Sequence, residues 1–140
     1  MPDMHHEIEI AAPSKKVYEA LTTSEGLRGW WTVDSQSEAT VGSVAEFGFF
    51  NRETVFRMRI DRLRPRRRII WTCLDGPEEW KGTVLTWALA PEGEGTKLHF
   101  KHGKWRSNKG AFAHCNSTWG ALMYRLKSYA EGKEQGPLFT

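Results

Sequence analysis

The chain has 140 residues, with 20 Lys and Arg against 17 Asp and Glu, which gives a formal net charge of +3 at pH 7. This length suits a single domain over 1–140, and we expect its folded core at about 4–132. The small basic excess does not indicate nucleic-acid binding. The sequence has no apolar run of 18 residues and no signal-peptide pattern at its start, so we expect a cytoplasmic protein without a membrane span.

The first forty residues combine strand and helix signals. Residues 4–11 alternate polar and apolar side chains, which is typical of a half-buried strand. Ser14 is a suitable N-cap for a helix that follows it. A second short helical turn is predicted over 24–31, where it ends in two Trp residues. A polar loop over 34–40 comes next, with a weak strand signal at 32–38.

The middle of the chain is dominated by strand signals. Strands are predicted at 43–50, 54–64, 67–74, 82–90 and 95–103. Their connections are short and contain turn-forming residues, which favours antiparallel hairpins over crossover connections. Apolar and polar side chains alternate along these strands, so the predicted sheet has one apolar face and one solvent face.

One long amphipathic helix is predicted from Asn108 to about Gly132. Its apolar side chains recur at helical spacing, at Ala111, Cys115, Trp119, Leu122, Leu126 and Tyr129. A helix of about 25 residues is about 37 Å long, and no other predicted helix is long enough to cover it. We therefore expect an α+β fold in which about six to seven antiparallel strands curve around this C-terminal helix, with two short helices after the first strand.

Several segments in this order resemble a known family. They are residues 8–22, 29–32, 64–72, 95–102 and 119–129. On these segments the chain is similar to the START-like, or helix-grip, ligand-binding superfamily, in particular the branch named after activators of the heat-shock-protein ATPase. The resemblance implies a cavity between the sheet and the long helix. The chain departs from the family at 103–110, where a short basic stretch replaces a loop or helix that is often longer and acidic.

Large apolar side chains dominate the faces that are predicted to point inward. They either fill the core completely or line a cleft between the helix and the sheet. The candidate ligand contacts are Trp31, Phe47, Phe49, Phe56, Met58, Trp71, Trp87, Phe100, His102, Cys115, Trp119 and Met123. The candidate polar groups are His102, His114 and the thiol of Cys115. His102 shares a strand face with Leu98 and Phe100, so it is the expected polar anchor.

Catalytic and metal-binding patterns are weak in this sequence. His114 and Cys115 are neighbours on the predicted helix, so their side chains diverge by about 100° and do not form a nucleophile–base pair. No histidine has a metal-ligand spacing with carboxylates. Cys73 and Cys115 are expected to be reduced, buried thiols. We predict no catalytic residue, no metal and no cofactor, and we lean toward a protein that is not an enzyme.

A cluster of arginines follows residue 56. Arg57 and Arg59 are predicted to face solvent on a strand, and Arg66 and Arg67 lie in a hairpin connection. The cluster either is a solvated edge that discourages strand-to-strand aggregation, or it docks an acidic protein or an anionic headgroup. No aromatic side chain accompanies it on that face, which disfavours nucleic acid.

Three functions follow from these observations. The first is the binding of a small, largely apolar molecule between helix and sheet. The second is a protein-interaction module, similar to a co-chaperone, that docks a protein partner through the basic edge. The third is a cyclase-like enzyme that acts on an apolar substrate with His102 as acid or base. The sequence is compatible with a monomer or a homodimer.

Overall fold

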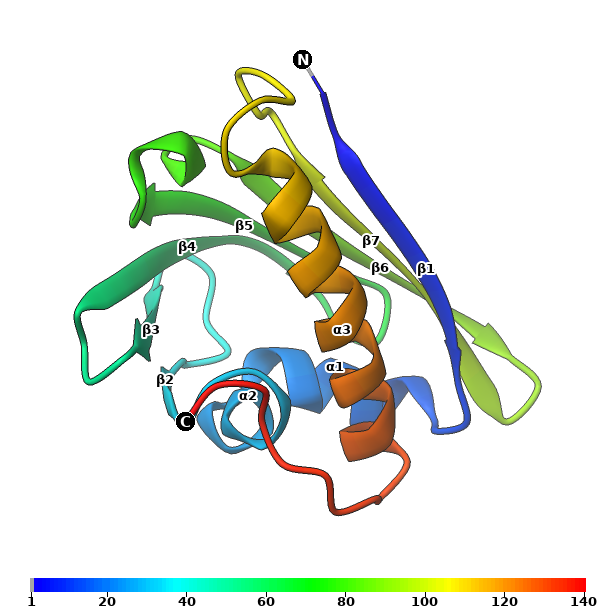
Figure 1. The fold of residues 1–140 in the computed structure, drawn as a ribbon. Coiled ribbons are helices and arrows are strands. Elements are labelled where there is room, and N and C mark those ends of the chain that lie inside the picture. The colour runs from blue at the N-terminus through cyan, green and yellow to red at the C-terminus, as the bar shows by residue number, and fades with distance from the viewer. Residues whose placement is uncertain (1) are drawn as a thin grey trace.

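In the computed structural model, which describes residues 2–140, a seven-stranded antiparallel sheet curls around one long helix (Figure 1). The strands are β1 (Met4–Ile10), β2 (Asp34–Gln36), β3 (Val44–Phe49), β4 (Thr54–Arg64), β5 (Arg68–Asp75), β6 (Val84–Glu92) and β7 (Gly95–Gly103). Their order is β1-β7-β6-β5-β4-β3-β2, so the first strand pairs with the last. This arrangement confirms the predicted α+β helix-grip fold.

The helices are α1 (Ser14–Thr22), α2 (Ser24–Trp30), the 3-10 helix η1 (Glu78–Trp80) and α3 (Phe112–Ala130). Figure 1 shows α3 across the concave face of the sheet, with α1 and α2 near its C-terminal end. Within residues 2–140, no helix is long and apolar enough to cross a membrane.

One prediction about local structure was wrong, and one short helix was not predicted. The long helix begins at Phe112 rather than at Asn108, because Gly110 has a left-handed φ of 66° and interrupts the helical path. The carboxylate of Glu79 accepts a hydrogen bond of 3.0 Å from the backbone N–H of Ala111 and so fixes the start of α3. The Glu79 carboxylate comes from η1, a helix that the alternation pattern did not predict.

The register of the sheet brings inward-facing rings opposite each other. Phe47 pairs with Phe56 across β3 and β4, and Trp87 pairs with Phe100 across β6 and β7. The ring centroids of Trp87 and Phe100 are 4.1 Å apart, and those of Phe100 and Trp119 of α3 are 4.4 Å apart. The apolar side of α3 therefore packs directly on β6 and β7, as the helical periodicity predicts.

The chain after α3 returns to the region between α2 and β2. The backbone N–H of Leu138 donates to the carbonyl of Trp30 at 3.1 Å, and that of Phe139 donates to the carbonyl of Trp31 at 2.9 Å. The carbonyl of Phe139 accepts from the N–H of Val33 at 3.2 Å. These bonds attach the tail to the body of the fold and place the Phe139 ring beside the open side of the sheet.

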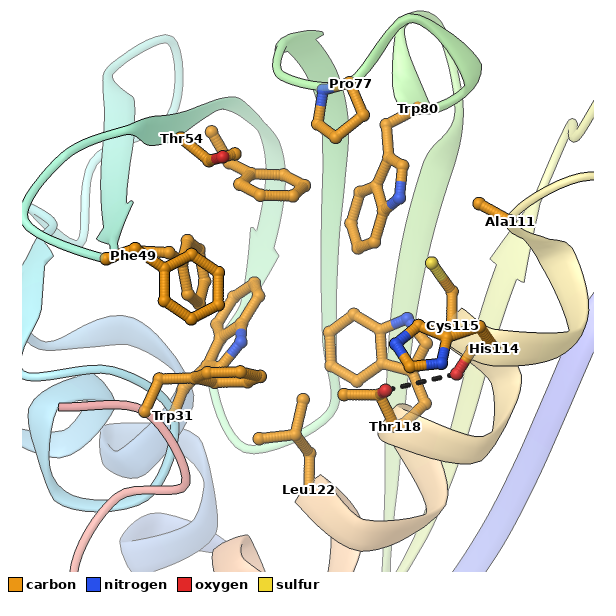
Figure 2. Close-up of a pocket in the computed structure, with 14 residues that line it drawn as sticks. Trp31, Phe49, Thr54, Pro77, Trp80, Ala111, His114, Cys115, Thr118 and Leu122 are labelled. Atoms are coloured by element: carbon orange, nitrogen blue, oxygen red, sulfur yellow. Dashed lines mark hydrogen bonds between the residues drawn. The ribbon is translucent and has the colours of Figure 1, made fainter.

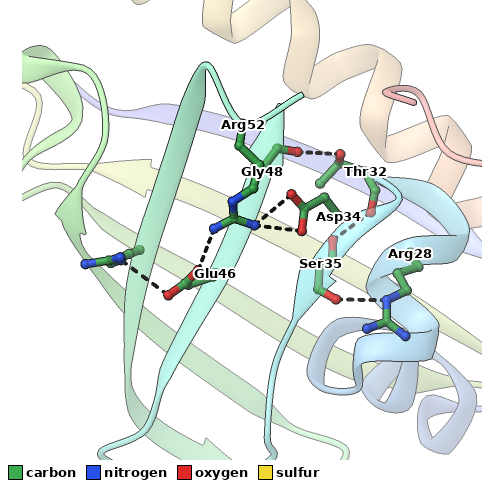
Figure 3. Close-up of polar contacts among 8 residues, drawn as sticks. Arg28, Thr32, Asp34, Ser35, Glu46, Gly48 and Arg52 are labelled. Atoms are coloured by element: carbon green, nitrogen blue, oxygen red, sulfur yellow. Dashed lines mark hydrogen bonds and ion pairs between the residues drawn. The ribbon is translucent and has the colours of Figure 1, made fainter. Parts of the chain in front are cut away.

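The turn between β3 and β4 has an unusual backbone and is held by ion pairs, which Figure 3 shows. Phe50, Asn51 and Arg52 all have left-handed φ values, of 53°, 56° and 67°. The guanidinium of Arg52 donates to both carboxylate oxygens of Asp34, at 3.0 and 2.8 Å, and to Glu46 at 2.8 Å. These contacts fasten the turn to the short strand β2.

Candidate functional site

A cavity of about 280 Å³ lies between the N-terminal half of α3 and the part of the sheet formed by β3 and β4 (Figure 2). Its lining comprises Trp31, Phe49, Phe50, Thr54, Phe56, Pro77, Trp80, Ala111, His114, Cys115, Thr118, Trp119, Leu122 and Phe139. Phe50 is 65% exposed, so the cavity reaches the molecular surface at the β3–β4 turn.

Aromatic rings from separate elements form most of the wall. Trp31, at the end of α2, has its ring centroid 5.3 Å from that of Trp119 on α3. On the sheet side, the rings of Phe49 and Phe56 are 5.2 Å apart, and Phe56 is 4.6 Å from Trp80 of η1. These three distances between ring centroids are typical of packed aromatic pairs. The wall therefore presents ring faces and edges to any occupant.

The polar groups of the lining are few and uncharged or weakly basic. The hydroxyl of Thr118 donates to the backbone carbonyl of His114 at 3.1 Å, and Figure 2 shows this bond on the α3 side. Cys115 is half-buried, and burial raises the pKa of its thiol, so the neutral form is favoured. No carboxylate is among the lining residues. The Thr118 hydroxyl has its proton engaged and can only accept from a ligand, so the cavity suits an apolar molecule that carries one neutral polar group such as a hydroxyl.

A buried hydrogen-bond chain supports two of the lining indoles. The Trp119 indole N–H donates to His102 Nδ1 at 3.1 Å, which requires the imidazole proton on Nε2. That Nε2–H donates to the Thr83 hydroxyl at 2.9 Å, and the hydroxyl donates to the Trp80 carbonyl at 2.6 Å. Burial lowers the pKa of His102 to about 3, so the ring is neutral. Both ring nitrogens are engaged, and His102 does not line the cavity.

The twelve candidate ligand contacts from the sequence divide into two groups. Five line the cavity: Trp31, Phe49, Phe56, Cys115 and Trp119. The other seven lie fully buried in the core and outside the lining: Phe47, Met58, Trp71, Trp87, Phe100, His102 and Met123. Other side chains therefore cover one part of the concave face of the sheet completely, and the cavity lies over another part.

Nine lining residues were not among the twelve candidate contacts, although His114 had been considered as a polar group: Phe50, Thr54, Pro77, Trp80, Ala111, His114, Thr118, Leu122 and Phe139. Leu122 lies on the predicted helical stripe, so periodicity was a usable signal for it. Trp80 and Phe139 belong to the 3-10 helix and the tail, where neither alternation nor helical spacing applies. Only their size and apolar character could have pointed to them.

The predicted docking arginines also separate in space. Arg57 and Arg59 form ion pairs with Glu46 and Asp61, at 3.4 and 2.6 Å. Arg66 and Arg67 lie at the tip of the β4–β5 hairpin, where they line a surface groove that is separate from the cavity. Across residues 2–140 no group of three or more His, Cys, Asp or Glu side chains is arranged to hold a metal ion.

Comparisons with known proteins agree with this architecture. A family model described as "Activator of Hsp90 ATPase homolog 1-like protein" matches residues 11–131. The solution structure of the Aha1 dimer from Colwellia psychrerythraea is 33% identical to this chain; the match covers 97% of this chain and 100% of that one, with a TM-score of 0.86. No curated protein matches the chain.

Two further structures share the fold at lower identity. MLL2253 from Mesorhizobium loti is 18% identical over 91% of this chain and 95% of its own, with a TM-score of 0.79. DynU16, a protein of the dynemicin biosynthetic locus, is 24% identical over 96% of this chain and 49% of its own, with a TM-score of 0.76. The match over residues 11–131 and the 33% identity to Aha1 show that the chain belongs to the family of activator of Hsp90 ATPase homolog 1-like proteins.

Proposed function

We propose that the protein binds a small, largely apolar molecule in the cavity between α3 and the sheet. The observation that supports this most directly is the aromatic wall of Trp31, Phe49, Phe56, Trp80 and Trp119 around an open volume of about 280 Å³. Ligand sites in proteins are mostly apolar clefts with a few polar groups that orient the ligand. Here His114, Cys115 and Thr118 on α3 are those polar groups.

The size of the cavity indicates the size of the ligand. An apolar cavity of about 150 Å³ holds one benzene molecule, so about 280 Å³ accommodates roughly twelve non-hydrogen atoms, or two fused rings. At ~0.5 kcal/mol per non-hydrogen atom, twelve atoms give ~6 kcal/mol, which corresponds to a Kd in the tens of micromolar. Titrations should therefore extend to about 1 mM.

A titration with 2-naphthol tests the proposal, with decanoate as a linear apolar probe. Three of the lining residues are Trp, so binding should change the intrinsic emission and raise the melting temperature. Thr118→Phe adds a ring inside the cavity and should weaken 2-naphthol binding at least tenfold. Ser117→Phe is the matched control, because Ser117 is the neighbouring residue on α3 and is exposed.

Two outcomes would contradict the proposal. One is that neither probe changes the emission or the melting temperature of the wild-type protein. The other is that Ser117→Phe weakens binding as much as Thr118→Phe, which would place the ligand elsewhere on the surface. A preference for decanoate over 2-naphthol would keep the site but change the ligand class from ring to chain.

We also propose that the protein forms a homodimer. The support is the Aha1 structure from Colwellia psychrerythraea, which is described as a dimer and is 33% identical to this chain over nearly its full length. Light scattering should then give a mass near twice the 16.1 kDa of the chain at micromolar concentration. A mass near that of one chain up to about 100 µM would contradict the dimer.

A further inference from the structure

The end of the sheet opposite the cavity carries a groove with a basic lining. The groove lies between the tip of the β4–β5 hairpin, the tip of the β6–β7 hairpin and the start of α1. Its lining is Ala11, Pro13, Ser14, Lys15, Arg66, Arg67, Pro91, Gly93, Glu94 and Gly95, and we call it the basic groove. Arg64 and Arg68, which pair across the hairpin, continue the positive charge beside it.

The arginines of this hairpin differ from all the others in their contacts. Every arginine outside the hairpin has an internal partner: Arg28, Arg52, Arg57, Arg59, Arg106 and Arg125 each donate to a carbonyl or pair with a carboxylate. Within residues 2–140, none of the five in the hairpin makes a side-chain hydrogen bond or an ion pair; they are Arg62, Arg64, Arg66, Arg67 and Arg68. Five guanidinium groups therefore keep all their donors available at one end of the molecule.

We propose that the basic groove docks an acidic, extended segment of a partner protein. Three positive side chains, Lys15, Arg66 and Arg67, line the groove, and Glu94 is its single acidic residue. The first turn of α1 has no acidic residue, so the positive end of its dipole adds to the field. The positive charges are spread over the tip of the β4–β5 hairpin and the start of α1. An extended chain of carboxylates can meet them together, whereas one compact anion cannot.

The surface chemistry favours protein over nucleic acid. The exposed large apolar residues of the described chain are Val33, Val41, Val44, Phe50, Leu74 and Tyr124, and none lines the basic groove. Without an exposed ring, there is no platform on which nucleic-acid bases could stack. Docking here would rest on charge and guanidinium–carboxylate hydrogen bonds, so it should be fast and strongly weakened by salt.

Fluorescence anisotropy with a labelled decapeptide of Asp and Glu tests this proposal. A decapeptide of Asn and Gln is the neutral control, and a ten-nucleotide oligouridine is the nucleic-acid control. The test variant is Arg66→Glu with Arg67→Glu. The matched variant is Lys104→Glu with Lys109→Glu, which makes the same change in net charge on exposed residues of the loop between β7 and α3, at the cavity end.

The proposal expects binding of the acidic peptide by the wild type at 50 mM salt and a fall of about tenfold in affinity by 150 mM. The Arg66 and Arg67 variant should lose at least tenfold in affinity, and the Lys104 and Lys109 variant less than twofold. Equal losses in the two variants would show a response to net charge alone and would overturn the proposal. So would absence of binding, or tighter binding of oligouridine than of the acidic peptide.

This test is independent of the apolar cavity. The substituted residues at both ends are exposed and lie outside the cavity lining, so 2-naphthol binding should be the same in all three proteins. Loss of naphthol binding in the Arg66 and Arg67 variant would reveal misfolding. In that case the single variants Arg66→Gln and Arg67→Gln, which remove charge without reversing it, should each lower peptide affinity by about threefold.

Discussion

Mild acid should destabilise this fold through His102. The Trp119 indole N–H can only donate, so His102 Nδ1 must remain an acceptor. Protonation would put two donors against each other in a buried site, and burial alone lowers the pKa of His102 from 6.5 to about 3. Because the folded-state pKa lies below the unfolded value, the stability is complete above about pH 6.5. It then decreases as the pH falls toward 3.

The expected loss can be calculated for pH 5. In the unfolded chain a histidine with an ordinary pKa of about 6.5 takes up a proton at pH 5, which lowers the free energy of the unfolded state by about 2 kcal/mol. The folded state gains almost nothing at pH 5, because its pKa of about 3 is two units lower. The loss of about 2 kcal/mol therefore depends little on the folded-state value, provided that it stays well below 5.

Urea unfolding at pH 8 and pH 5 measures this loss. The free energy of unfolding of the wild type should fall by about 2 kcal/mol more than that of His102→Gln over the same interval. His102→Gln will be less stable at both pH values, but the comparison uses only the change with pH. The control His114→Gln, at an exposed position on α3, should keep the wild-type loss. Equal losses in the wild type and His102→Gln would refute a buried neutral imidazole.

Two further predictions concern the cavity thiol and the helix packing. A thiol reagent should modify Cys115 slowly, because burial raises the pKa of its thiol, and bound 2-naphthol should slow the reaction further. Burial raises the pKa of Cys73 to about 12, so Cys73 should react only when the protein unfolds. Gly26→Ala should lower the free energy of unfolding by about 1–3 kcal/mol, because the added Cβ would lie 2.6 Å from the Ala20 Cα. The control Gly120→Ala has its nearest neighbour at 3.8 Å and should stabilise α3 by up to about 1 kcal/mol; similar effects of both substitutions on urea unfolding would contradict this packing.

The sequence was sufficient to predict most of the fold because its periodic patterns are strong. Alternation over 54–64 and 95–103 predicted β4 and β7 with their observed bounds. Helical spacing predicted α3 but not its first turn, since Gly110 and the Glu79 carboxylate set that turn through tertiary contacts. The 3-10 helix and the tail carry no periodic signal, so their positions depend on the contacts that they make.

The site was harder to predict than the fold. Alternation shows which side chains face inward, but not which of these another element covers. Phe47 and Phe49 share a strand face two residues apart, yet the ring of Trp31 lies 4.4 Å from that of Phe47, and only Phe49 lines the cavity. The boundary between filled core and open cavity is set by where α2, η1 and the tail lie over the sheet.

The left-handed backbone of residues 50–52 restricts which side chains can stand at the entrance of the cavity. A side chain at such a φ costs roughly 1 kcal/mol relative to glycine, so glycine at position 50 would favour folding. Glycine would also remove the Phe50 ring, which lines the cavity and lies 6.2 Å from the ring of Phe139. Replacing Phe50 by glycine would therefore relax the turn and widen the entrance at the same time. At position 50, this chain therefore cannot have both a more stable turn and a narrower entrance.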